Sequence, residues 1–281
     1  MRGRTSRRCG ASDVAEMATD PMVSVLFITY NRLLLLKRTL KTFTSRTTYP
    51  NLELVVADDG SSPLVQAEIR RLPFHEFVLS ERNRGLGANA NAGLLRCHGA
   101  YVLMIQDDWD CVADTDYLGD TIHVMVQYPD IGLVKYYGDA HTLRPEPRSG
   151  VAEPCFEIAE QEEMKTNLVY SDTPHVMSRA ALQCIGPYRE DCDMESCEMD
   201  YARRFGAQNS FKAAVFPAYY NRIFVHTGGD TSYRTSRARY RIDRALGPLA
   251  RCLRRCPPAF RVAKTVVRRS VETLERLRVI R

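Results

Sequence analysis

Four short, nearly continuous apolar runs stand out in the first part of the chain, and polar turn residues directly follow each one. Runs of this length are typical of strands that are buried on both faces of a parallel sheet. We therefore predict four buried strands. They lie in "MVSVLFITYNR" (22–32), "LELVVADDGSS" (52–62), "HEFVLSERNRGLG" (75–87) and "YVLMIQDDWDCV" (101–112).

Segments with helical character separate these runs. Residues 33–46 carry apolar side chains at helical spacing, and residues 88–100 form a small-residue helix pattern that Gly99 ends. Strands that alternate with helices build a right-handed, doubly wound sheet. The predicted fold class is therefore α/β, with a doubly wound, mostly parallel sheet.

The second half of the chain has a less regular pattern. Beyond Arg234 it predicts two basic helices that are broken at Pro257 and Pro258, because proline disrupts a helix interior. The other predicted elements are strands in 131–138 and 171–179, a helix in 197–207, and a strand running into a glycine-containing loop in 219–234. We expect a disordered leader over 1–21, one α/β domain over 22–233 and a basic helical extension over 234–281.

Composition narrows the class of protein. The chain has 281 residues, of which 44% are hydrophobic, so it can bury a large core. Its nine cysteines are scattered and contain no CxxC pair, which favours reduced thiols over disulfides or a zinc site. No apolar run approaches the length of a membrane span, and the N-terminal residues lack the apolar centre of a secretory signal. We expect a cytoplasmic protein.

The charge is unevenly distributed. The net charge is +5, but residues 234–281 contain fifteen basic residues and three acidic ones, a net charge of +12, which leaves −7 on the rest. An acidic body argues against a nucleic-acid-binding protein. The basic extension also carries apolar residues, so it could lie on an anionic membrane surface, or it could pack over the acidic body.

Polar residues at the strand ends are the candidate site. Ligands of doubly wound sheets bind beyond the carboxyl ends of the strands, where these turns should meet. A single acidic turn can be a helix cap or an Asx turn, but four polar turns in succession favour a binding site. The turns are Thr29-Tyr30-Asn31-Arg32, Asp58-Asp59-Gly60-Ser61, Asn83-Arg84-Gly85 and Gln106-Asp107-Asp108-Trp109-Asp110.

The three carboxylates of the fourth turn predict a hard divalent cation. Mg²⁺ and Mn²⁺ prefer oxygen ligands and complete their coordination with water and substrate phosphates. Without such a cation the carboxylates would repel a diphosphate. The turn therefore predicts a phosphate-containing substrate.

The motifs "VSVLFITYNR", "LELVVADDGSS", "NRGLGANANAG" and "QDDWD" are similar, in this order, to those of family 2 glycosyltransferases with the GT-A fold. The similarity is strong from Val23 to Asp110 and looser to about Arg234. It implies a nucleoside-diphosphate-sugar donor, an acceptor hydroxyl on a saccharide, lipid-linked molecule or natural product, inversion of configuration, and Mn²⁺ or Mg²⁺ as cofactor. The donor-binding residues that it implies are Thr29, Tyr30, Arg32, Asp58, Asp59, Asn83, Arg84, Gly85, Asn91, Asp107 and Arg234.

The same resemblance implies a DXD-type metal motif with two possible registers, residues 106–108 or 108–110. Asp108 belongs to both registers, so it is the expected ligand, with Asp107 and Asp110 beside it. A late histidine, His226, precedes Gly228 and Gly229 and is the candidate third ligand. His175 is a weaker candidate, for the acceptor site.

The segment "GPYREDCDMESCEMDYARRFGA" resembles the turn and acidic helix start that carry the catalytic base in this family. Matching "DYARR" to the family pattern places the base at Glu198, with Asp200, Asp193 and Glu195 as alternatives. Acidic residues at a helix start can also simply complement the helix dipole.

Two other functions are compatible with such a sheet. A sugar-nucleotide pyrophosphorylase would need a glycine-rich triphosphate loop after the first strand, and "TYNRLLLLKR" contains no glycine. A non-catalytic nucleotide-sugar-binding protein is the other alternative, and the retained carboxylates argue against it.

Overall fold

The computed structural model describes residues 20–138, 146–147, 157–159 and 170–228. The chain divides into two compact units, Met1–Thr227 and Gly228–Arg281, and the described residues belong almost entirely to the first. The predicted leader lies almost wholly, and the predicted basic extension wholly, outside the described residues. Within the described part, no helix has the length and apolar character that a membrane span requires.

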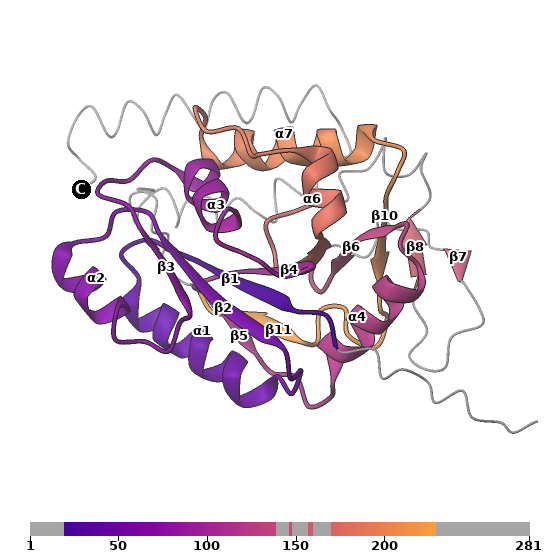
Figure 1. The fold of residues 1–281 in the computed structure, drawn as a ribbon, viewed down its shortest axis with the longest axis horizontal. Coiled ribbons are helices and arrows are strands. Elements are labelled where there is room, and N and C mark those ends of the chain that lie inside the picture. Colours follow the sequence, from indigo (N-terminus) through magenta and orange to yellow (C-terminus); the bar gives the residue numbers. More distant parts are fainter. Residues whose placement is uncertain (1–19, 139–145, 148–156, 160–169, 229–281) are drawn as a thin grey trace, which may run out of the picture. The chain divides into compact units, whose positions relative to one another are not determined.

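The four predicted strands form one half of a nine-stranded sheet in the described part of the chain (Figure 1). They run parallel to one another in the spatial order β3-β2-β1-β4. The prediction of a parallel, doubly wound arrangement is therefore confirmed, and β1, β2 and β4 are mostly buried, whereas β3, at the edge of the sheet, is only half-buried. The bounds are β1 (Val23–Thr29), β2 (Leu52–Asp58), β3 (Glu76–Leu79) and β4 (Tyr101–Gln106).

The strand register explains why the polar turns meet. Thr29 at the end of β1 pairs with Asp58 of β2, and its neighbour Ile28 pairs with Gln106 of β4. The same edge continues to β3, where Leu79 also pairs with Asp58. All four strands thus end at nearly the same level, and the residues that follow them must share one edge of the sheet.

The other half of the sheet is mixed. β9 (His175–Ser178) lies antiparallel between β4 and β6 (Ile131–Lys135), and β10 (Lys212–Val215) then runs parallel to β6. Two short strands, β8 (Glu157–Ala159) and β7 (Glu146–Pro147), follow in antiparallel order. The strands predicted in 131–138 and 171–179 are confirmed, whereas β7, β8 and β10 were not predicted.

Helices cover both faces of the sheet, each over its own apolar core (Figure 1). On one face, α1 (Leu33–Arg46), α2 (Pro63–Ile69) and α4 (Tyr117–Gln127) bury residues such as Phe43 against Phe27. On the other face lie α3 (Leu86–Leu94), α6 (Arg179–Ile185) and α7 (Met194–Ala207). The sequence predicted α1, α3 and α7.

The small residues of α3 have a packing role. A Cβ added at Gly93 would lie 2.5 Å from a methyl carbon of Leu26 in β1, so the helix approaches the sheet more closely than a side chain would allow. This close approach holds the C-terminal part of α3 against β1 and β2.

A second, two-stranded sheet joins distant parts of the chain. β5 (Trp109–Cys111) pairs antiparallel with β11 (Phe224–His226), in the register that sets His226 opposite Trp109. The late strand was predicted, but we expected Trp109 and Asp110 to be part of a turn. Their pairing brings a segment more than a hundred residues later against the acidic turn.

Candidate active site

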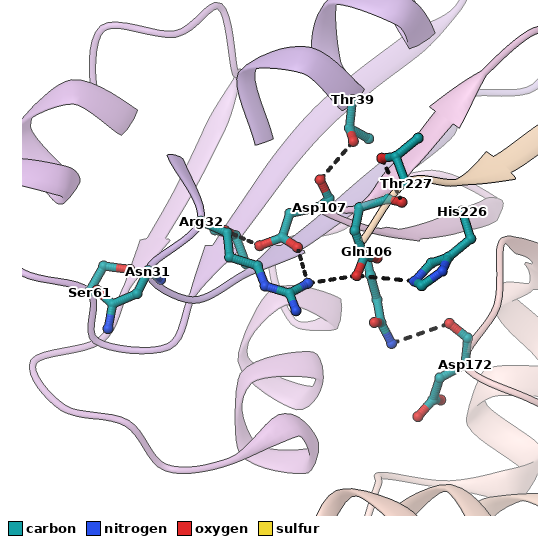
Figure 2. A network of polar contacts seen from close by, with 11 residues as sticks. Asn31, Arg32, Thr39, Ser61, Gln106, Asp107, Asp172, His226 and Thr227 are labelled. Carbon is teal, nitrogen blue, oxygen red and sulfur yellow. Dashed lines mark hydrogen bonds and ion pairs between the residues drawn. The ribbon is translucent and has the colours of Figure 1, made fainter. Parts of the chain in front are cut away.

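Asp107 holds the acidic turn in place. Its carboxylate accepts hydrogen bonds from the Thr29 hydroxyl at 2.7 Å and from Nη1 of Arg32 at 3.2 Å, and its backbone carbonyl accepts one from Thr39 at 2.8 Å (Figure 2). Burial raises the pKa of Asp107 to about 6, against the opposing effects of Thr29 and Arg32. Both carboxylate oxygens therefore already have partners, and they connect β4 to the end of β1 and the start of α1.

Within the part of the chain that the structure describes, Asp108 and Asp110, unlike Asp107, each have a partner on only one carboxylate oxygen. Oδ2 of Asp108 lies 2.6 Å from Nη1 of Arg32 and 3.3 Å from Nε2 of His226, and Asp110 forms an ion pair with Arg38. Each carboxylate keeps its other oxygen, Oδ1, buried and without a hydrogen-bond partner among the described residues. A buried, unpartnered carboxylate oxygen is costly unless something else coordinates it.

The β5–β11 pairing positions His226. Its ring lies 4.9 Å from that of Trp109, and Thr227 donates both its backbone N–H, at 2.8 Å, and its hydroxyl, at 3.1 Å, to the carbonyl of Asp108. The tryptophan that interrupts the acidic turn thus packs against the late histidine. The structure brings His226 to the acidic turn, as predicted.

These residues fit a divalent cation in part. The described residues contain no preassembled cluster of three carboxylate, imidazole or thiol groups. However, Mg²⁺ is commonly held by only one or two carboxylates together with water and substrate phosphates. The unpartnered Oδ1 atoms of Asp108 and Asp110 match that donor set, and His226 lies close enough to Asp108 to add a nitrogen ligand.

The second acidic turn organises the backbone around it. Asp58 accepts hydrogen bonds from the backbone N–H of Ser61 at 2.9 Å and from its hydroxyl. Asp59 accepts the backbone N–H groups of Arg84 at 2.8 Å and Gly85 at 2.9 Å. Burial raises the pKa of Asp59 above its usual value, although these two N–H groups oppose the shift. The turns after β2 and β3 are therefore connected.

The turns after β1 and β2 are also connected. The backbone N–H of Asn31, which has a φ of 54°, donates to the Ser61 hydroxyl at 2.8 Å. Gly60 has a φ of 77°, and a Cβ there would overlap backbone atoms of Arg82. Tyr30 follows β1 directly and is half-buried at this edge.

The residues predicted after β3 divide into two groups. Asn83 is exposed and caps the N–H of Gly85 at 3.2 Å, and exposed Arg84 forms an ion pair of 3.0 Å with Glu190. Asn91 instead uses its amide to hold Tyr188, donating to its carbonyl at 2.9 Å and accepting its N–H at 2.8 Å. The structure thus gives Asn91 contacts with the segment before α7, where we expected contacts with the nucleotide.

Two of the four candidate bases at α7, Asp193 and Asp200, have structural partners of their own. Asp193 caps the helix by accepting the N–H of Ser196 at 2.8 Å, which lowers the pKa of its carboxyl. Glu195 is exposed in the first turn. Asp200 pairs with Arg204 at 2.9 Å, and Arg204 in turn donates to backbone carbonyls of the preceding segment. Asp193 and Glu195 therefore lie at the helix start, as expected of acidic residues that stabilise a helix, whereas Asp200 forms an ion pair within the helix.

Glu198 is directed toward the sheet edge. Its Oε1 accepts the backbone N–H of Asp172 at 3.0 Å. The carbonyl of Asp172 in turn accepts the side-chain amide of Gln106, at the end of β4, at 3.4 Å (Figure 2). Glu198 is therefore linked through Asp172 to the end of the strand that carries the acidic turn.

Asp172 was not among the predicted site residues. Its Oδ1 accepts the Tyr170 hydroxyl at 2.8 Å, and its Oδ2 is buried without a partner in the described part of the chain. Burial, followed by the nearby charge of Glu198, raises its pKa to about 7. It lines a small cavity at the strand ends together with Ile28, Leu86, Ala90, Met104, Ile105, Gln106 and Tyr188.

Topology explains why Asp172 was missed. The sequence rule for parallel strands indicates the residues that follow each strand, but β9 is antiparallel to β4, and His175 at its start pairs with Met104 near the end of β4. The residues that precede an antiparallel strand therefore lie at the same edge as those that follow the parallel ones. The segment "SDTPH" would have been noticed had the strand's direction been known.

His175 and Arg234 are the remaining predicted residues. His175 is completely buried, and burial lowers its pKa to about 4, so it is a neutral imidazole within the fold. That position does not suit the acceptor contact that we considered for it. Arg234 lies outside the described residues.

With this geometry established, comparison with known proteins assigns the family. Residues 24–186, more than half of the chain, match the family model described as Glycosyl transferase family 2. The chain belongs to glycosyltransferase family 2. The enzyme class predicted from the motifs is thereby confirmed.

Curated relatives of this glycosyltransferase are longer proteins. Glycosyltransferase GlyA of Streptococcus pneumoniae is 30% identical over 126 residues, which are 43% of this chain and 18% of GlyA. The GalNAc(5)-diNAcBac-PP-undecaprenol beta-1,3-glucosyltransferase of Campylobacter jejuni is 25% identical over 124 residues, 42% of this chain and 38% of that enzyme. The matches thus span less than half of either relative.

Solved structures confirm the GT-A fold of this glycosyltransferase. TarS 1–349 of S. aureus superposes with a TM-score of 0.56 at 18% identity, covering 73% of this chain and 60% of that one. The mannosyltransferase PcManGT of Pyrobaculum calidifontis, in complex with GDP-Man and Mn²⁺, superposes with a TM-score of 0.53 at 19% identity. The superposition covers 77% of this chain and 59% of that one.

Proposed function

We propose that this enzyme transfers a sugar, with inversion, from a nucleoside diphosphate to an acceptor hydroxyl, and that it uses Mn²⁺ or Mg²⁺. The observation that carries the proposal is the pair of buried, unpartnered Oδ1 atoms of Asp108 and Asp110 at the carboxyl edge of the sheet. The complex of PcManGT with GDP-Man and Mn²⁺, and that of TarS with UDP, support it by analogy of fold.

The hydrogen bonds favour one register of the acidic motif. Both carboxylate oxygens of Asp107 have protein partners, so it would serve as the support of the turn. Asp108 and Asp110 each have an oxygen to offer, so they would be the metal ligands, with His226 as a candidate third. The bound cation would stabilise the negative charge of the leaving diphosphate.

The donor nucleotide would lie along the joined turns after β1, β2 and β3. Thr29, Tyr30 and Arg32 line the first of these turns. Asp58 and Asp59 shape the second and third, because they hold the backbone of Ser61, Arg84 and Gly85. Here Asp58 and Asp59 act mainly through the backbone that they position.

Glu198 would act as the general base. Its Oε1 is oriented by the N–H of Asp172, and as a carboxylate it can remove the proton of the acceptor hydroxyl. The hydroxyl oxygen then attacks the anomeric carbon as the bond to the diphosphate breaks, which inverts the configuration. None of the other three candidates on α7 has this link to the strand ends.

A thermal-shift panel tests the proposal most directly. UDP-, GDP- and dTDP-sugars would each be added with and without Mn²⁺. We expect at least one donor to raise the melting temperature only when Mn²⁺ is present, and slow donor hydrolysis to accompany it. If no donor stabilised the enzyme in either condition, the proposed substrate class would be wrong.

A further inference from the structure

The start of α1 supplies positive charge to the acidic turn. Arg32 occupies the N-cap position of α1, and its Nη1 lies between Oδ1 of Asp107 and Oδ2 of Asp108. One turn and a half later, Arg38 pairs with Asp110. Two guanidinium groups of one helix thus face three carboxylates of one turn.

The Arg32 bridge is largely shielded from water. The side chain of Arg32 is 13% exposed, that of Asp107 5% and that of Asp108 7%. Arg38, in contrast, is 58% exposed. Burial by itself lowers the pKa of Arg32, but Asp107 and Asp108 raise it above its usual value, so Arg32 is a permanent cation. Charges so close together interact strongly where water is scarce.

A divalent cation and Arg32 would compete for Asp108. A cation that coordinates Asp108 would lie a few ångströms from a guanidinium that shares the same carboxylate, and like charges at that distance repel each other. The same Nη1 also contacts Asp107 at 3.2 Å, so Arg32 would keep this second carboxylate as a partner while its contact with Asp108 is lost. A buried guanidinium that loses one anion is stabilised by another, and diphosphates bind arginine well.

We propose that Arg32 is a resident counter-ion of the metal site, which makes binding of the divalent cation depend on the donor diphosphate. In the free enzyme Arg32 pairs with Oδ2 of Asp108, so its positive charge weakens binding of a cation at the neighbouring Oδ1. When the donor binds, its diphosphate draws Arg32 away from Asp108, and this repulsion is relieved. Cation and donor therefore bind cooperatively, and neither should bind tightly alone. This inference rests on the proposed metal site.

The test measures Mn²⁺ binding, independently of turnover. Mn²⁺ is titrated into the full-length enzyme, and free Mn²⁺ is followed by electron paramagnetic resonance, alone and with the nucleoside diphosphate, UDP or GDP, that stabilises the protein. The same nucleotide without protein corrects for its own Mn²⁺ binding. For the wild type we expect the nucleotide to tighten Mn²⁺ binding by about tenfold or more, within the usual range of coupling between sites.

Variants of Arg32 identify its role. Arg32→Gln should bind Mn²⁺ alone about tenfold more tightly than the wild type and lose most of the dependence on nucleotide. Arg32→Lys keeps the charge, so it should retain weak binding of Mn²⁺ alone. Arg71→Gln, which removes an exposed arginine paired with Glu68 on the surface, is the control and should behave like the wild type.

Two results would overturn the inference. The first is that Arg32→Gln and Arg32→Lys both bind Mn²⁺ alone no more tightly than the wild type does. The second is that the nucleotide tightens Mn²⁺ binding by Arg32→Gln as much as it does for the wild type. Failure of the underlying metal site looks different. In that case Asp108→Asn would bind Mn²⁺ as the wild type does, or no variant would bind it under any condition.

Discussion

The backbone N–H of Asp172 donates a hydrogen bond of 3.0 Å to Oε1 of Glu198, although 26 residues separate the two. This contact joins the start of an antiparallel strand to the acidic helix α7. Among the described residues, the second oxygen of Glu198 has no hydrogen-bond partner. It also sets two carboxyl groups side by side, and this proximity contributes to the raised pKa of Asp172.

Replacing Glu198 by glutamine should stop catalysis without loss of donor binding. Glutamine has nearly the same size and can still accept the N–H of Asp172, but it cannot take a proton. We expect turnover to fall by about 10²-fold or more, with nucleotide affinity little changed. Steady-state kinetics and nucleotide titration would measure both.

Asp200→Asn is the matched control for Glu198→Gln. It removes the partially exposed pair with Arg204 and should cost less than about 1 kcal/mol of stability, with little effect on turnover. A larger loss of turnover in Asp200→Asn than in Glu198→Gln would transfer the role of base to Asp200.

The same substitution at Asp108 and at Asp107 should affect turnover differently. Asp108→Asn removes a proposed metal ligand, so turnover should drop by at least about 10²-fold, and the weakened ion pair with Arg32 should also lower stability. Asp107→Asn weakens the support of Thr29 and Arg32 and should lower the free energy of unfolding by about 2 kcal/mol. Chemical denaturation and turnover of both variants give the comparison, and near wild-type turnover of Asp108→Asn would remove it from the metal site.

Asp172 should give the folded protein a pH-dependent stability. Its pKa of about 7 lies above that of an aspartate in an unfolded chain, so between about pH 4 and pH 7 only the folded state holds the proton. Stability therefore falls as the pH rises through this window, and the loss is complete above it. Asp172→Asn carries no such proton and should remove this contribution.

Urea denaturation of both proteins at pH 4.5 and pH 8 measures the effect. The stability of Asp172→Asn relative to the wild type should increase toward pH 8, by up to about 3 kcal/mol, since one pKa unit corresponds to about 1.4 kcal/mol. Asp107, whose pKa is also raised, contributes equally to both proteins. Parallel pH profiles would show that the carboxyl of Asp172 is not perturbed.

Gly60→Ala should damage the turn that joins β2 to the segment after β3. The φ of 77° is unfavourable for alanine, and its Cβ would overlap backbone atoms of Arg82. We expect a loss of about 2 kcal/mol in stability together with weaker nucleotide binding. Thermal unfolding with and without nucleotide would report both, and unaltered values would mean that the turn can relax.

The basic extension remains a prediction from sequence. If residues 234–281 lie on a membrane, the full-length enzyme should co-sediment with anionic vesicles at low salt and be released at high salt. A chain that ends at Tyr240 should then stay folded but no longer bind the vesicles. If the extension instead covers the acidic body, that truncation should aggregate, and the full-length enzyme should show no salt-sensitive binding.

The local pattern of apolar and polar residues was sufficient to predict much of the fold. The four parallel strands could be predicted because burial on both faces of a strand leaves a short continuous apolar run. The helices α1, α3 and α7 could be predicted because burial on one face leaves a helical pattern within a few turns. The meeting of the polar turns could be predicted as well, because parallel strands end at one edge. The resemblance of the motifs then indicated the family.

Tertiary structure decided what each polar residue contacts. The sequence singled out Asp108 but left the roles of Asp107 and Asp110 open, and only the packing of α1 and β11 determines which of their oxygens find partners. The direction of β9 placed Asp172 beside Glu198, and the pairing of β5 with β11 brought His226 to Asp108. Contacts between residues far apart in the chain depend on strand direction and helix packing, and a local pattern of apolar and polar residues contains neither.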